Sequence, residues 1–77
     1  MNPIDQLALE VAATLRQAQT KHAPMHSPHE GWSVIYEELE ELREHVRGDT
    51  GTTADARTEA MHTAAMAMRY VVDLCGG

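Results

Sequence analysis

The chain has 77 residues, with six basic and twelve acidic side chains, a formal net charge of −6 at pH 7 and one cysteine. This charge argues against a nucleic-acid partner, whose backbone requires a basic surface, and one cysteine excludes an internal disulfide. A single domain of this size, residues 1–77, buries only about 60% of its unfolded surface, so metal binding or oligomerisation is the expected source of added stability. No stretch reaches the roughly 18 apolar residues of a membrane span and no signal peptide opens the chain, so we expect a soluble cytoplasmic protein without membrane partners.

Apolar residues at helical spacing predict a first helix from about Asn2 or Pro3 to Thr20. Asn2 suits the N-cap position, and Pro3 suits the first helical position, where its missing N–H would have no partner in any case. The stripe expected to be buried comprises Ile4, Leu7, Ala8, Val11 and Leu15.

Two prolines, Pro24 and Pro28, predict a loop after the first helix, because each disfavours helical backbone at the residue before it. Ser27, followed by Pro28 and by Glu30 at the third position, matches an N-cap with a capping box. The second helix therefore begins near Pro28 and runs to about Val46. Its expected apolar face comprises Trp32, Ile35, Leu39, Leu42 and Val46.

A turn-rich connection over residues 48–55 precedes a third helix, which Thr53 or Asp55 would cap and which continues to Leu74. Residues 60–75 are apolar nearly all round, and a helix that is apolar on every side is expected to be buried on every side. Two further helices from one chain cannot cover such a helix. The sequence therefore predicts an all-α fold, a three-helix bundle completed by oligomerisation as a homodimer or homotetramer.

Four glutamates and a histidine on the second and third predicted helices carry the main chemical signal. Residues three or four apart share a helix face, which groups Glu37 and Glu38 with Glu41 and sets Glu59 one turn from His62. Crowded carboxylates repel one another unless a cation offsets their charge. Antiparallel packing of these helices would gather them around Mg²⁺ or Mn²⁺, which prefer oxygen ligands. A solvated acidic face without metal is the alternative.

Three stretches that together cover about half of the chain resemble a known family: residues 29–35 (HEGWSVI), 36–42 (YEELEEL) and 59–69 (EAMHTAAMAMR). They are similar to the all-α nucleotide pyrophosphohydrolases of the MazG-like group, particularly the short single-domain members found in phages and bacteria. The resemblance implies cleavage of nucleoside triphosphates between the α and β phosphates, which gives a monophosphate and pyrophosphate. It also implies assembly as dimers or tetramers.

The family pattern is Glu-Glu-x-x-Glu on one helix and Glu-x-x-Asp on the next, where these side chains hold Mg²⁺ against the triphosphate. Glu37, Glu38 and Glu41 match the first element, and Glu59 begins the second. His62 stands where the second element has Asp, and imidazole is a poorer ligand for Mg²⁺ than for softer metals such as Mn²⁺ or Zn²⁺. The resemblance implies that these five residues bind metal and that Glu37 and Glu38 are catalytic.

Three further residues are candidates for substrate contact. Trp32 would stack on a nucleobase, although a core or interface position is the commoner role of a tryptophan on an amphipathic helix. Lys21 and Arg69 would bind phosphate, and an ion pair with an acidic residue is the alternative for Arg69.

Two other hypotheses complete the analysis. His22, His26 and His29 have the spacing of a helical zinc site, but the prolines among them favour solvated loop histidines. The alternative to a metal-dependent pyrophosphohydrolase is a catalytically silent helical oligomer that binds a nucleotide or a protein partner.

Overall fold

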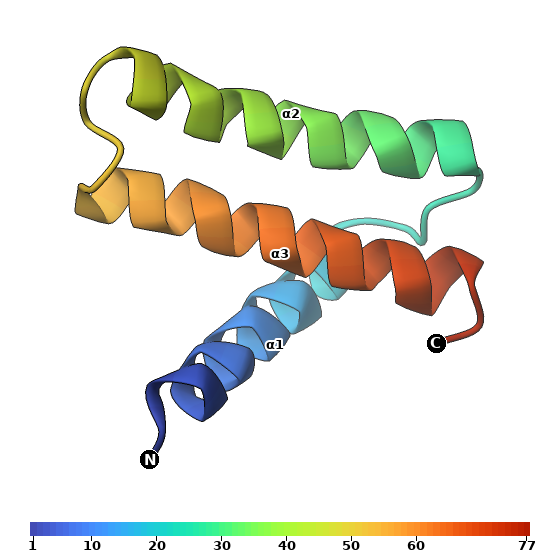
Figure 1. Ribbon diagram of the computed structural model, residues 1–77. Coiled ribbons are helices and arrows are strands. Elements are labelled where there is room, and N and C mark those ends of the chain that lie inside the picture. Colours follow the sequence, from blue (N-terminus) through green and yellow to red (C-terminus); the bar gives the residue numbers. More distant parts are fainter.

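Three α-helices form the computed structural model, which describes all 77 residues: α1 (Pro3–Lys21), α2 (Pro28–Arg47) and α3 (Ala54–Leu74). The helices α2 and α3 lie side by side and antiparallel, and α1 crosses α3 obliquely (Figure 1). Both α1 and α2 pack against α3, but they do not pack against each other. The predicted all-α fold and its three helices are confirmed, and no helix has the length and apolar character needed to cross a membrane.

Each helix begins at the N-cap that the sequence indicates, because a side-chain oxygen there accepts an otherwise unpaired backbone N–H. The bonds run from Ile4 N–H to Asn2, from Glu30 N–H to Ser27 and from Ala56 N–H to Thr53. The capping box differs from the expectation in one detail. The Glu30 carboxylate accepts the backbone N–H of His26 at 3.2 Å, one residue before the N-cap.

The core is small and lies where α1 crosses α3. Its buried cluster comprises Val11, Leu15, Ala65 and Met66, with Ala18, Val34, Ile35 and Met61 packed around it. Only eight of the 77 residues are buried. A chain of this size needs most of its apolar side chains covered to be stable, so much of the expected core is not formed within one copy.

The predicted apolar stripe of α1 is only half buried. Val11 and Leu15 are buried as expected, but Ile4, Leu7 and Ala8 are exposed. The reason is the oblique crossing, since α1 meets α3 through its C-terminal half and its first turns have no neighbour (Figure 1).

The predicted apolar face of α2 is also incompletely covered. Ile35 and Leu42 are partly buried, whereas Trp32, Leu39 and Val46 are exposed. α2 has only α3 as a neighbour, so the outer part of a broad apolar face has nothing to pack against.

One face of α3 remains uncovered, although the sequence predicts burial on every side. We call it the open face of α3; it comprises Ala60, Ala64, Ala67, Met68, Val71 and Val72, all exposed. Their spacing of three or four residues makes one continuous stripe along the helix.

The backbone of α2 lies close to α3 at Gly31, the one buried residue of α2. A Cβ atom at this position would lie 2.5 Å from Cδ2 of Tyr70 and 3.1 Å from Cδ1 of Leu74. The absence of a side chain at Gly31 therefore allows the ring of Tyr70 to lie directly against the α2 backbone.

Replacement of Gly31 by alanine is expected to lower the free energy of unfolding. Overpacking costs about 1–3 kcal/mol, whereas alanine gains about 1 kcal/mol in helix propensity, so a net loss of about 1 kcal/mol is expected. Urea unfolding followed by circular dichroism measures it. Ser33→Ala, on the exposed side of the same helix, is the control, and a Gly31→Ala protein as stable as this control would contradict the close packing.

Candidate metal centre

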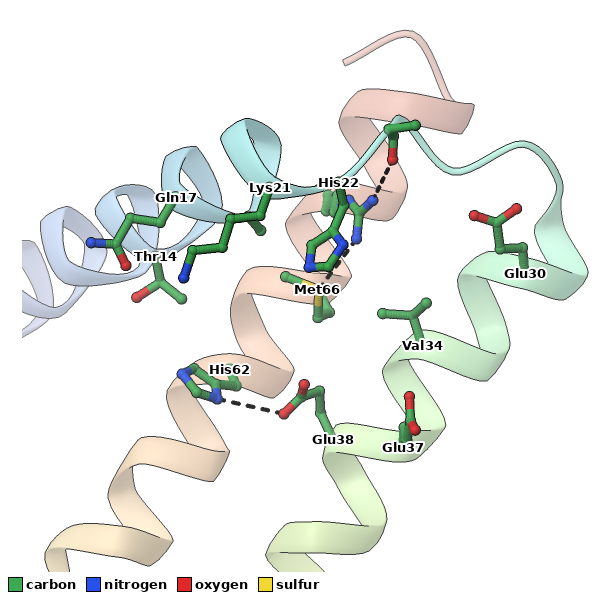
Figure 2. A pocket seen from close by; sticks show the side chains of 13 residues that line it. Thr14, Gln17, Lys21, His22, Glu30, Val34, Glu37, Glu38, His62 and Met66 are labelled. Carbon is green, nitrogen blue, oxygen red and sulfur yellow. Dashed lines mark hydrogen bonds and ion pairs between the residues drawn. The ribbon is translucent and has the colours of Figure 1, made fainter.

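The antiparallel packing of α2 and α3 brings two glutamates and a histidine together. Glu38 on α2 faces Glu59 and His62 on α3, and one potential ligand atom from each lies within 4.8 Å of the others. Nδ1 of His62 is 3.5 Å from Oε2 of Glu38 and 3.9 Å from Oε2 of Glu59. Figure 2 shows His62 and Glu38 pointing toward each other from the two helices.

The pKa values of two carboxyl groups in or beside this cluster are raised. Burial raises the pKa of Glu38, and the neighbouring charge of Glu41 adds to this effect, whereas His62 lowers it. A side-chain hydrogen bond with Glu59 raises the pKa of Glu41, with burial and the charge of Glu59 acting in the same direction. The cluster therefore holds more negative charge than its surroundings readily accommodate.

Two carboxylate oxygens in the cluster are buried without a hydrogen-bond partner: Oε2 of Glu38 and Oε2 of Glu59. The two side chains are only 25% and 20% exposed. Both oxygens lie within 3.9 Å of the His62 ring nitrogen, but neither accepts a hydrogen bond from it. A buried carboxylate oxygen without a hydrogen bond is costly, and a cation between the two would offset that cost. Two carboxylates and an imidazole form a donor set that fits a divalent cation, including Mn²⁺ and Zn²⁺ as well as Mg²⁺.

The structure brings together three of the five predicted metal ligands, Glu38, Glu59 and His62. Glu41 is exposed and lies outside this group, although Glu59 is near enough to raise its pKa. Glu37 is exposed and lies outside the cluster, because consecutive helical residues point about 100° apart. It lines the adjacent cleft instead.

A cleft of about 510 Å³ opens beside the cluster, between the three helices and the loop that follows α1. Glu37, Glu38 and His62 lie at one end of it, and Lys21 and His22 lie at the other (Figure 2). The cleft therefore has an acidic end formed by α2 and α3 and a nitrogen-rich end formed by the C-terminus of α1.

The three predicted substrate contacts are placed differently. Lys21 and Arg69 both line the cleft. The Arg69 guanidinium forms a buried ion pair with Asp73, with Nε 3.4 Å from Oδ2. Trp32 is 61% exposed outside the cleft, and its ring centroid lies 6.0 Å from that of Tyr36. Contact of Trp32 with a nucleobase stays a prediction.

His22 is a cleft residue that the sequence analysis did not assign to the substrate. It was considered only for a zinc site with His26 and His29, and these three do not form a group of potential ligands in the structure. Its position directly after Lys21, at the end of α1, is the sequence signal that could have placed it beside the phosphate candidate.

Comparison of the chain with protein-family models, with curated proteins and with solved structures finds no match. The expected relation to the MazG-like family therefore stays a prediction from the residues of the acidic elements. The geometry adds an independent fact, which is that the two elements meet across α2 and α3 at the edge of a cleft.

Without metal, the free energy of unfolding is expected to fall as the pH rises through the raised pKa values of Glu38 and Glu41. Between the unfolded and folded pKa values the folded state binds more protons, so stability is full below the unfolded pKa and is lost above the folded one. Glu38→Gln and Glu41→Gln each remove a charge, so each is expected to flatten this dependence and to stabilise the metal-free protein at neutral pH.

Thermal unfolding in EDTA from about pH 4 to about pH 8 measures this dependence. Glu44→Gln is the matched control, since Glu44 lies on the same helix with an exposed side chain. Identical slopes for Glu38→Gln and Glu44→Gln would contradict the crowding of charge at the cluster.

Proposed function

We propose that the chain is a divalent-metal-dependent nucleoside triphosphate pyrophosphohydrolase, which converts a nucleoside or deoxynucleoside triphosphate to its monophosphate and pyrophosphate. The observation that carries the proposal is the pair of buried carboxylate oxygens on Glu38 and Glu59 that accept no hydrogen bond, at the edge of a cleft of about 510 Å³. The acidic elements that contain them also resemble those of the MazG-like family. Mg²⁺ or Mn²⁺ is the proposed cofactor.

The residues of the cluster have distinct roles in this proposal. Glu38, Glu59 and His62 would hold the cation, since their potential ligand atoms lie within 4.8 Å of one another between α2 and α3. Glu41, one helical turn from Glu38, is proposed to add a further carboxylate. A divalent cation bound there offsets phosphate charge and lowers the pKa of water for in-line attack. Glu37, exposed at the acidic end of the cleft, accepts a proton from the attacking water as general base.

The negative net charge of the protein explains why it would need a bound cation to hold a triphosphate. The chain carries a net charge of −6, which repels a triphosphate at long range. The cation at the acidic end and Lys21 at the other end of the cleft supply the two positive groups that a phosphate chain needs. Lys21 thus contacts the phosphates farthest from the cation.

Incubation with each ribo- and deoxyribonucleoside triphosphate and Mg²⁺ or Mn²⁺ is expected to release pyrophosphate. Glu38→Gln removes a metal ligand and is expected to lower the rate at least about 100-fold. Glu44→Gln, which alters an exposed carboxylate of the same helix, is expected to leave the rate unchanged.

Release no faster than that of Glu38→Gln, with every nucleotide and both metals, would end the enzymatic proposal. The alternative is then a catalytically silent helical oligomer. Thermal melts with and without metal and nucleotide show whether that oligomer binds a nucleotide, because a ligand at about 100 times its dissociation constant stabilises the fold by roughly 2.7 kcal/mol.

The proposed assembly is a homo-oligomer in which a second copy covers the open face of α3. Two observations support this. Only eight residues are buried within one copy, and the open face is a continuous apolar stripe of six residues. Alanines on that stripe would let a partner helix approach closely, and methionine and valine would fill the remaining space.

Val71→Asp, in the C-terminal part of the open face, is expected to dissociate the oligomer. A symmetric interface receives the new charge twice, so the dissociation constant should rise at least about 100-fold. Sedimentation velocity at several concentrations measures it. Thr58→Asp, on the opposite side of α3, is the control, and an unchanged association state in Val71→Asp would refute this interface.

A further inference from the structure

The most deeply buried charges in the protein are Arg69 and Asp73, one turn apart on α3. Their side chains are 6% and 7% exposed. Buried ion pairs seldom add net stability, because apolar side chains of similar volume usually stabilise a fold as well or better. Packing alone therefore does not account for a charged pair at this position.

Both charges bind the loop between α1 and α2. Nη2 of Arg69 donates to the carbonyl oxygen of Ala23 at 2.6 Å, and Oδ2 of Asp73 accepts the backbone N–H of Met25 at 2.9 Å. The side chain of Met25 is itself buried. The loop is thus tied to α3 twice: its Ala23 carbonyl accepts a hydrogen bond from Arg69, and its Met25 N–H donates one to Asp73.

This tie fixes the nitrogen-rich end of the cleft. Lys21, the last residue of α1, and His22 immediately precede Ala23, so a displacement of Ala23 acts on the end of the chain segment that carries them. Because α1 and α2 do not pack against each other, the place of Lys21 relative to Glu38 depends on contacts made through α3 and this loop. Arg69 itself lines the cleft.

We infer that Arg69 and Asp73 are positioning residues for an oligophosphate: they clamp the loop to α3 and hold Lys21 and His22 at a fixed separation from the metal-binding carboxylates. The inference rests on the proposed function. It extends that function by naming a second subsite, which binds phosphate at the end of the cleft away from the cation. Arg69 then acts on phosphate through the loop, with its guanidinium engaged by Asp73 and Ala23.

The test compares two ligands in two variants of the full chain. Arg69→Lys keeps the charge but cannot bond Asp73 and Ala23 simultaneously with a planar fork. Tripolyphosphate binding in the presence of Mn²⁺, measured by calorimetry, is expected to weaken about tenfold. Mn²⁺ binding without phosphate, measured by electron paramagnetic resonance, is expected to stay within about twofold, because the cation ligands are not touched.

Asp73→Asn retains an oxygen that accepts the Met25 N–H, so it is expected to fold and to lose less tripolyphosphate affinity than Arg69→Lys. If Arg69→Lys does not fold, the comparison of Asp73→Asn with the wild-type protein is the test of the clamp. Hydrogen exchange at the amide of Met25 reports the clamp directly. It is expected to accelerate more in Arg69→Lys than in Asp73→Asn. Arg47→Lys, at the exposed end of α2, is the control and should change the affinity for neither Mn²⁺ nor tripolyphosphate.

Three results would overturn the inference: a wild-type protein that binds no tripolyphosphate, variants in which Mn²⁺ and tripolyphosphate affinities fall together, or faster exchange at Met25 with unchanged tripolyphosphate affinity. A wild-type protein that binds tripolyphosphate through Lys21 but releases no pyrophosphate would refute the proposed function and leave the clamp standing.

Discussion

The close antiparallel packing of α2 on α3 is the constraint on which the rest of the structure depends. It brings carboxylates from both helices into one cluster, although their mutual repulsion opposes it. Apolar contacts along the pair, and the bare backbone at Gly31 against Tyr70, hold the helices together against that repulsion. The raised pKa values of Glu38 and Glu41 are the electrostatic signature of this conflict. A cation would resolve it without any change in the packing.

Two stripes of residues on different sides of α3 have different roles. One stripe, with spacing of three, four, three and four residues, carries the polar groups of the cluster and of the loop clamp, and the neighbouring stripe is the open face. The polar stripe comprises Glu59, His62, Met66, Arg69 and Asp73. Within it, Met66 belongs to the buried core and lies between the acidic end and the clamp. The cleft thus follows one side of a single rigid helix, and its two ends are held at a separation that the helix sets.

Local signals gave the helices and the acidic elements, because N-caps such as Asn2, Ser27 and Thr53 act within three residues of themselves. Periodicity identified apolar faces but not what would cover them, so the exposure of Ile4 and Trp32 could not be foreseen. The exposure of Ile4 follows from the oblique crossing of α1 over α3, and that of Trp32 from the absence of a second neighbour for α2; no local pattern encodes either. The hydrogen bonds that Arg69 donates to Ala23 and that Met25 donates to Asp73 join residues more than forty positions apart, so no local pattern encodes them either.

The cluster is more buried than an ordinary acidic helix face. On a solvated face, glutamate side chains extend into water, which satisfies every oxygen and screens their charges. Glu44 and Arg47, at the far end of α2, behave in this way, with side chains 69% and 58% exposed. Glu38 and Glu59 instead turn toward each other and lose water from one oxygen each without gaining a hydrogen bond. A 77-residue chain with so small a core has little stability with which to offset such a loss, so the bound cation proposed above would stabilise the folded chain.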